Sequence, residues 1–422
     1  DFMDLIETFG AKIGALSEEK PQRARQLLTA GFRANGVKNK LASKRSSKSD
    51  RMLFQLVNRA MVTCLAKPQS NVMVSLFTPC EMLHLQGLHP YSCEGFSSYL
   101  SGAMAEQPFL HQAEDTGIPN SLCSYHKVFI GAAQMGLMPK PRFILSTSLA
   151  CDANTLTFRH LAQFYDVPHF NVDIPFESSP QAVDYVAGQL RQMGEFLTQQ
   201  TGLPLDDGQL ARTVARSQRT MALYHRGLRL RAGRQVLSDL TSELLRTAAF
   251  HFLLGTPETE AYARQLLREI TTAPPAQGKQ LLWIHTTPYW VAPLRHLFAQ
   301  STRVQVAACD MSYEGIVEAD PTKPYEAMAR RLVYSPFNGP AQRRIDRALE
   351  MAKTVGADGA VWFCHWGCKH TLGGARLGKK ALEEAGLPTL LLDGDSCDRG
   401  FGGEGQAATR MEAFLEVLEG MA

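Results

Sequence analysis

Short apolar runs alternate with segments of helical periodicity in two parts of this sequence. The runs are VMVSLF (72–77), RFILSTS (142–148) and PHFNVDIP (168–175), then LLWIHTT (281–287), VQVAACD (304–310), GAVWFCHW (359–366) and TLLLDGD (389–395). Buried strands separated by helices are typical of parallel sheets, because each connection must return to the same end of the sheet. We therefore predict an α/β protein with two flavodoxin-like parallel-sheet domains.

The rest of the chain is predicted to be helical. Residues 1–70 and 178–270 show apolar residues at roughly helical spacing, and TTAPPAQGK (271–279) is typical of a linker. The sequence thus predicts four parts: a helical N-terminal segment (1–70), a first α/β domain (71–177), a helical connector (178–275) and a second α/β domain (276–422).

Composition narrows the class of protein. Of the 422 residues, 45% are hydrophobic and 20% are charged, which excludes a wholly disordered chain. The net charge is only +3, which does not favour nucleic-acid binding. No apolar run reaches the ~18 residues of a membrane helix, and no secretory signal opens the sequence. We expect a cytoplasmic protein with neither a nucleic-acid nor a membrane partner.

Most of the cysteines occupy one kind of position. The chain has nine, and six lie at the end of a predicted strand or in the loop after it: Cys80, Cys151, Cys309, Cys364, Cys368 and Cys397. Ligands of open parallel sheets bind in the crevice beyond the carboxyl ends of the strands. We therefore expect cysteines of the two domains to converge in the cleft between them. The alternative for any single cysteine is a small buried hydrophobe.

The spacing of these cysteines excludes several familiar sites. Paired CxxC motifs of zinc fingers and CxxCxxC runs of ferredoxins are absent, and CHWGC (364–368) is a weak signal alone. No GxGxxG or GxxxxGK[ST] loop is present, so we do not expect the chain itself to bind ATP. A dispersed set of thiolates remains, which suits an iron–sulfur cluster or zinc.

Six segments resemble the large subunits of the 2-hydroxyacyl-CoA dehydratase and benzoyl-CoA reductase superfamily. They are FTPCE (77–81), SLCSYHK (121–127), SLACDAN (148–154), YDVPHFNVDIP (165–175), HWGCKHT (365–371) and LPTLLLDGDSCD (387–398). The resemblance implies α/β domains with a [4Fe–4S] cluster in the cleft between them. It also implies that Cys123, Cys151 and Cys368 hold this cluster, and that a separate activator with its own [4Fe–4S] cluster supplies electrons by hydrolysing ATP.

Further cysteines depart from this three-ligand pattern. They resemble the branch of the superfamily that carries a double-cubane [Fe8S9] cluster, and that resemblance implies a homodimeric low-potential reductase of small molecules. On this interpretation Cys80 and Cys397 join the three common ligands, and the sixth is Cys364, with Cys93 in reserve. The alternative is a 2-hydroxyacyl-CoA dehydratase subunit with a single [4Fe–4S] cluster, and the physiological substrate stays open. Cys64 and Cys309 are expected to be buried structural residues.

Three residues beside the cysteine motifs are candidate proton donors. His126 and Lys127 follow Cys123, and His365 lies between Cys364 and Cys368. A histidine suits proton transfer near neutral pH because its ordinary pKa lies there. We expect a catalytic role for these three residues, with a structural role as the alternative for each.

Overall fold

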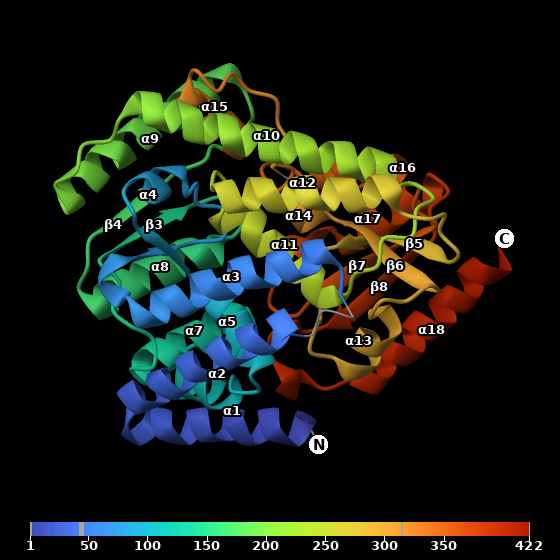
Figure 1. Ribbon diagram of the computed structural model, residues 1–422, viewed down its shortest axis with the longest axis horizontal. Helices are drawn as coiled ribbons and strands as arrows, with labels where there is room; N and C mark the ends of the chain where they lie inside the picture. Colours follow the sequence, from blue (N-terminus) through green and yellow to red (C-terminus); the bar gives the residue numbers. More distant parts are fainter. Residues whose placement is uncertain (1, 42–45, 314, 422) are drawn as a thin grey trace.

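The computed structural model describes residues 2–41, 46–313 and 315–421. Within these residues the chain is an α/β protein with two four-stranded parallel sheets, and helices of the N-terminal segment pack beside the first sheet (Figure 1). The predicted fold class is confirmed at this level. The predicted domain boundaries stay a prediction.

The first sheet has the strand order β2-β1-β3-β4. Its strands are β1 (Asn71–Val74), β2 (His89–Ser92), β3 (Phe143–Thr147) and β4 (His169–Val172). The helices between them are α4 (Glu81–Leu85), α5 (Cys93–Gly102), α6 (Gln107–Asp115), α7 (Ser124–Gln134) and α8 (Asp152–Tyr165). Every residue of the central strands β1 and β3 is buried, as expected where helices cover both faces of a parallel sheet.

The second sheet has the order β6-β5-β7-β8. Its strands are β5 (Lys279–Ile284), β6 (Val304–Cys309), β7 (Gly359–His365) and β8 (Thr389–Gly394). Its helices are α13 (Ala292–Phe298), α14 (Asp310–Tyr313), α15 (Pro324–Val333), α16 (Ala341–Val355), α17 (Lys369–Glu384), η2 (Arg399–Phe401) and α18 (Glu404–Gly420). Each sheet therefore places its first strand between its second and third. In such an order, neighbouring connections leave on opposite faces at that point and open a crevice.

The sequence did not predict β2. It is four residues long and contains Pro90, which cannot donate a backbone hydrogen bond to a neighbouring strand. β2 lies at the edge of its sheet and pairs with β1 alone, where a missing donor costs least. The other strands match predicted runs but end up to three residues earlier, because the polar ends of those runs form the loops that reach the site.

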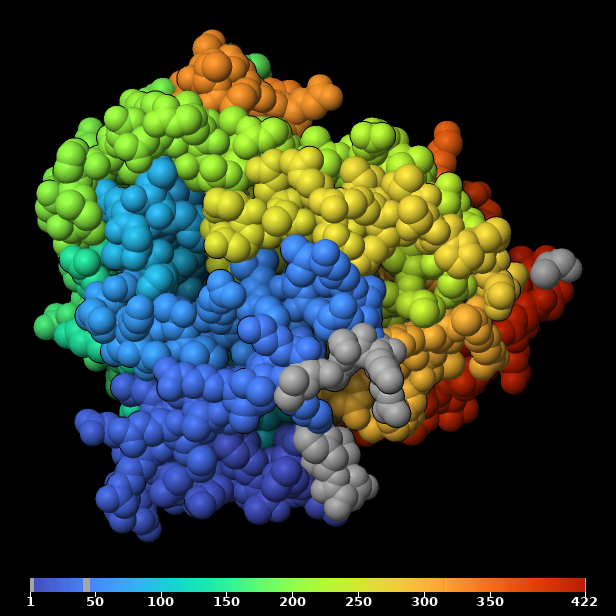
Figure 2. Space-filling view, in the orientation of Figure 1, coloured from blue at the N-terminus to red at the C-terminus, as the bar shows by residue number. Residues whose placement is uncertain are grey.

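Helices of the N-terminal segment and the connector cover one side of the molecule. They are α1 (Phe2–Glu19), α2 (Pro21–Leu41), α3 (Lys48–Ala66), the short η1 (Pro68–Ser70), α9 (Pro180–Thr201), α10 (Asp207–Arg231), α11 (Leu240–Phe252) and α12 (Pro257–Thr272). Figure 2 shows α3 in blue beside α12 in yellow. α3 contacts both α12 and α11, so segments far apart in the sequence form one layer.

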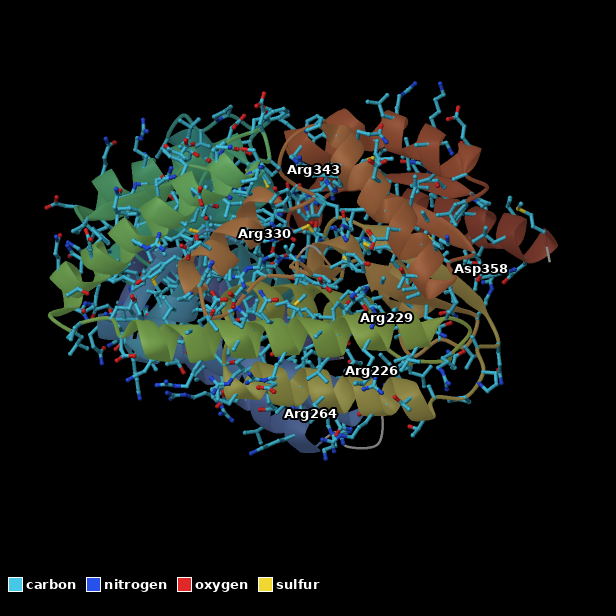
Figure 3. The ribbon with its side chains drawn as sticks, turned by 90° about the horizontal axis from the view of Figure 1, so that it is seen from above. Arg226, Arg229, Arg264, Arg330, Arg343 and Asp358 are labelled. Atoms are coloured by element: carbon cyan, nitrogen blue, oxygen red, sulfur yellow. The ribbon has the colours of Figure 1, made fainter. Side chains whose placement is uncertain are left out.

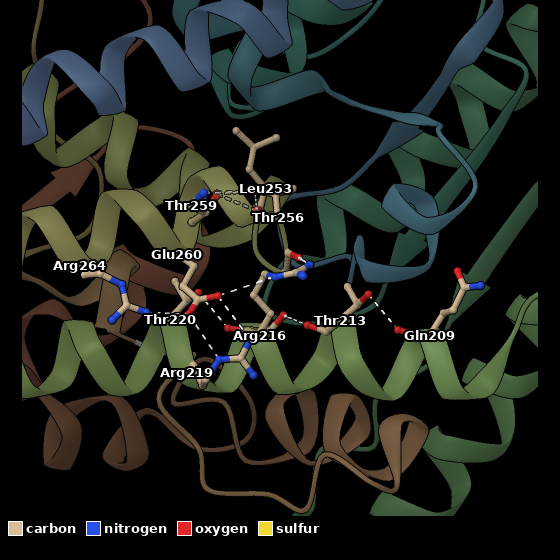
Figure 4. Close-up of polar contacts among 12 residues, drawn as sticks. Gln209, Thr213, Arg216, Arg219, Thr220, Leu253, Thr256, Thr259, Glu260 and Arg264 are labelled. Atoms are coloured by element: carbon tan, nitrogen blue, oxygen red, sulfur yellow. Dashed lines mark hydrogen bonds and ion pairs between the residues drawn. The ribbon is translucent and has the colours of Figure 1, made fainter.

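The long helices α10 and α12 run side by side (Figure 3). Glu260 of α12 accepts hydrogen bonds from Arg219 and Arg264 and lies 3.7 Å from Arg216 (Figure 4). These ion pairs are partly exposed, so each contributes at most about 1 kcal/mol, and the apolar contact between the helices dominates. Arg226 and Arg229 extend the same arginine-rich face of α10.

Polar contacts join the two sheet-containing halves. Ser124 donates to Asp395 over 2.7 Å, and the hydroxyl of Tyr125 lies 3.0 Å from that of Ser396. On another side, the buried Glu81 accepts two hydrogen bonds from Arg331 of α15. Buried charge pairs of this kind fix geometry, because separating them leaves an unpaired buried charge.

None of the helices in the described residues is long and apolar enough to cross a membrane.

Candidate iron–sulfur site

Three cysteines stand immediately before the first residue of three helices. Cys123 precedes α7, Cys151 precedes α8 after β3, and Cys368 precedes α17 after β7. None of the three side chains caps its own helix with a hydrogen bond. A helix N-terminus carries partial positive charge and free backbone N–H groups, so it stabilises a negatively charged sulfur. The fold therefore places three sulfur atoms beside the partial positive charge of three helix N-termini.

These three cysteines line one cavity of about 140 Å³, to which both halves of the protein contribute. The loops after β1, β3, β5 and β7 all reach it, so it lies where the crevices of the two sheets meet. Gly367 permits the close approach of the two halves. Its φ is +83°, and a Cβ there would lie 2.7 Å from the Cα of Cys123. Only glycine satisfies both conditions without displacing Cys123.

The pKa values of two of these thiols report their surroundings. Burial raises the pKa of Cys123 well above its ordinary value, and the neighbouring Cys368 and Cys151 raise it further. Burial, followed by the influence of Cys368, raises the pKa of Cys151 to about 12. Three thiols in mutual electrostatic contact lose their protons together only when a cation compensates their charge, as bound metal does.

Two of the predicted histidines contact these cysteines. The Nε2 atom of His365 lies 3.3 Å from the sulfur of Cys123. The backbone N–H of Ser396 donates to Nδ1 of His365, so the proton of the neutral ring lies on Nε2 and is donated to sulfur. His126 lies with Nε2 at 3.9 Å from the sulfur of Cys151. Hydrogen bonds to ligand sulfurs tune the reduction potential of a cluster.

Several buried polar atoms around the cavity have no protein partner. Among the described residues these include Nδ1 of His126, Nδ1 of His285 and Oδ1 of Asn154, all belonging to residues that line it. Such atoms are costly unless a ligand or water satisfies them. No three His, Cys, Asp or Glu side chains in the described ranges surround a single metal ion. In a [4Fe–4S] cluster each cysteine binds a different iron. Cys123, Cys151 and Cys368 come from three different loops and line one cavity, which fits the donor set of such a cluster.

The cavity also contains a buried carboxyl group that sequence reasoning missed. Glu94 lies in the first turn of α5, and burial raises its pKa to about 7. It accepts a hydrogen bond from the backbone of Leu76, and among the described residues that line the cavity it is the one carboxyl group. Nothing in the sequence marks Glu94, because its position depends on β2, which the sequence did not predict.

A buried arginine lines the cavity as well. Arg344 of α16 pairs with Asp310 over 2.8 Å and donates to Thr371 over 2.8 Å. Asp310 also accepts from the backbone N–H of His285, whose φ is +82°. The Asp310 carboxylate therefore holds both a charged side chain and a strained backbone at the wall of the cavity.

The remaining predicted ligands do not line this cavity. Cys80 donates to the carbonyl of Thr78, and Cys397 donates to that of Ser97. Cys364 is in strand β7, beside Asp393 and Arg410. Adjacent residues of a strand face opposite sides, so when His365 faces the cavity Cys364 faces away.

The other predicted residues have structural surroundings. Cys93, the reserve ligand, is buried in the first turn of α5 and does not line the cavity. Lys127 does not line it either, because its ammonium pairs with Glu114 over 2.6 Å. Cys64 and Cys309 are buried, as expected.

The chain was compared with known proteins. A family model described as 2-hydroxyglutaryl-CoA dehydratase, D-component, matches residues 75–418. The chain belongs to this family. A curated relative is the (R)-phenyllactyl-CoA dehydratase alpha subunit of Clostridium sporogenes, which is 22% identical over 337 residues, covering 74% of this chain and 80% of that relative. The part of the predicted resemblance that concerns the dehydratase family is thus confirmed.

Proposed function

We propose that this protein is the iron–sulfur component of a 2-hydroxyacyl-CoA dehydratase, with a [4Fe–4S] cluster held by Cys123, Cys151 and Cys368. The observation that carries the proposal is the convergence of these cysteines, from three helix N-termini, on one cavity at the junction of the two halves. Family membership supports this proposal, and so do the buried polar atoms around the cavity that have no protein partner.

The residues of the cavity have separable tasks in this proposal. A cluster held by Cys123, Cys151 and Cys368 would supply one-electron chemistry, and with three protein ligands one iron would be free to bind a substrate oxygen. His365 donates a hydrogen bond to the sulfur of Cys123 and thereby stabilises the reduced, more negative form. Glu94 offers a carboxyl oxygen as acceptor for a substrate hydroxyl or proton. Apolar walls exclude water, which strengthens both interactions.

The proposed partners follow from the family. An activator with its own [4Fe–4S] cluster delivers a single electron at the expense of ATP, because the chain shows no phosphate-binding loop of its own. The Clostridium sporogenes relative is named as one subunit of its dehydratase. We propose that this chain likewise acts with a second subunit, either another chain or a second copy of itself.

The double-cubane alternative requires three more thiolates. Cys80, Cys364 and Cys397 are not among the residues that line the cavity, which favours three ligands over six. Cys397 is buried, and the pKa of its thiol is raised by burial and then by Asp395, Glu106 and Cys123. A low-potential reductase with an [Fe8S9] cluster would need the backbone around these cysteines, including strand β7 at Cys364, to rearrange when the cluster is inserted.

Single cysteine variants test this proposal. We expect Cys123→Ser, Cys151→Ser and Cys368→Ser, purified without oxygen, to lose most of their iron and visible absorption. Cys64→Ser is the matched control, since Cys64 is fully buried in α3 outside the cavity, and it should keep its iron. Retention of full iron content by any one of the three variants would contradict the proposed ligand set.

A further inference from the structure

Part of the cavity is lined by two helices that carry none of the three proposed ligand cysteines. Val57 and Met61 of α3 and Leu244, Leu245 and Ala248 of α11 line it. The two helices pack against each other. α3 precedes residue 75, where the match to the family begins, so this wall includes a segment that the family model does not describe.

The part of the cavity lined by α3 and α11 adjoins the part lined by Glu94 and the three cysteines. A Cβ at Gly95 would lie 3.3 Å from the methyl carbon of Met61, which places α3 directly against the turn that carries Glu94. On the other side, the rings of Phe77 and Phe337 lie 5.4 Å apart, and Phe337 lies 5.8 Å from His370, two residues after Cys368. A ligand bound at the cysteines would therefore extend its side chain toward α3 and α11.

The charges around the cavity restrict what this side chain can be. Among the described residues that line the cavity, Arg344 is the one lysine or arginine, and its charge is already paired with Asp310. Glu94 is the one described carboxyl group in this lining, and in its ionised form it would repel a second negative group. A carboxylate carried by the ligand side chain would be buried without a cation, which is strongly unfavourable.

We infer that the wall formed by α3 and α11 selects acyl groups with an uncharged, apolar side chain, such as an aryl or branched alkyl group, and rejects dicarboxylic acyl groups. That the ligand is a CoA thioester rests on the proposed function. The preference for an apolar side chain rests on the residues of α3 and α11 that line the cavity. It assigns to the N-terminal segment a direct role in substrate choice, and it favours the aryl type of substrate over the glutaryl type.

Binding measured by calorimetry on the full chain tests the inference. The probes are 3-phenylpropanoyl-CoA, glutaryl-CoA and CoA itself. Neither ester has a 2-hydroxyl group to be eliminated. Burying an aryl ring contributes enough to favour 3-phenylpropanoyl-CoA over glutaryl-CoA by about tenfold or more in Kd. Equal or tighter binding of glutaryl-CoA would overturn the inference while leaving the proposed function intact.

Substitutions that fill the space beside α11 provide a second test, with a matched control on α12. Ala248→Phe places a ring in the apolar end and should remove the preference for the aryl ester. Ala261→Phe, on the exposed face of α12, adds the same ring elsewhere and should leave the preference unchanged. Leu244→Asn provides a second variant if Ala248→Phe does not fold, and it should weaken binding of the aryl ester by about tenfold. An unchanged preference in a folded variant of either kind would overturn the inference.

Indole separates this inference from the proposed function, because it is apolar and contains no CoA. If no CoA ester binds but indole binds to the wild type and not to Ala248→Phe, the wall is established as an apolar binding site and the proposed function fails. If indole and 3-phenylpropanoyl-CoA both fail to bind, the inference is overturned.

Discussion

Substitution of Arg246 by methionine should strongly destabilise the protein, because Arg246 is the central cation of a buried network behind the apolar wall. Its guanidinium pairs with Glu243 over 2.5 Å and donates to the hydroxyl of Tyr262 over 2.9 Å. Both charged side chains are almost fully buried, at 2% and 0% exposure. Methionine has a similar volume but removes the cation that is hydrogen-bonded to the Glu243 carboxylate, and leaves Arg231 as its remaining charged neighbour. Removing one partner of a buried pair costs about 3–5 kcal/mol.

The loss should also depend on pH, through Asp50 of α3. Burial raises the pKa of Asp50 to about 6, and the nearby Arg246 lowers it. Because the folded protein holds this proton more tightly than the unfolded chain, Asp50 reduces stability as pH rises through about 4 to 6. Without Arg246 its pKa rises further, so the penalty extends to higher pH. The free-energy difference between wild type and Arg246→Met should therefore be larger at pH 8 than at pH 5.5.

Urea unfolding followed by circular dichroism at these two pH values measures the effect. The double variant Glu243→Gln/Arg246→Met provides the control, because it removes the stranded charge and should recover more than half of the loss at pH 8. A single-variant cost below about 1 kcal/mol, or an equal cost at both pH values, would refute the reasoning that a buried charge network anchors α3 to α11.

Three further outcomes follow from the site. Gly367→Ala should lower both stability and iron content, since its Cβ would meet the backbone of Cys123, and thermal unfolding with iron analysis checks both; unchanged iron would show that this contact does not position the ligand. His365→Ala should shift the reduction potential of the bound cluster to a more negative value, measured by a redox titration followed by electron paramagnetic resonance. An unchanged potential would show that His365 does not donate a hydrogen bond to the sulfur of Cys123. Cys397→Ala should retain the iron content of the wild type; loss of half of that iron would favour the double-cubane reading.

Much of the architecture was predictable because it depends on short-range patterns. Apolar runs such as 281–287 and 359–366 mark central strands of parallel sheets, since both faces of those strands are covered. Placement of Cys151 and Cys368 at strand ends followed from the same reasoning. The strand β2 escaped prediction because an edge strand needs few hydrogen bonds and tolerates proline.

The site was only partly predictable, because the direction of a side chain depends on structure that a linear pattern does not encode. Cys80 follows β1 as expected, yet its thiol turns back to the carbonyl of Thr78. Cys364 lies one residue before the cavity-lining His365, and strand geometry sends it to the opposite face. Glu94 and the wall of α3 and α11 depend on contacts between segments far apart in the sequence, so no local motif could reveal them.

The most direct test of the central claim is the iron and acid-labile sulfide content per chain of protein purified without oxygen, with electron paramagnetic resonance on the dithionite-reduced sample. The three-cysteine site predicts about four irons and four sulfides, and the signal of a single reduced [4Fe–4S] cluster. About eight irons per chain would contradict it, and would require further cysteines such as Cys80, Cys364 and Cys397 to become ligands.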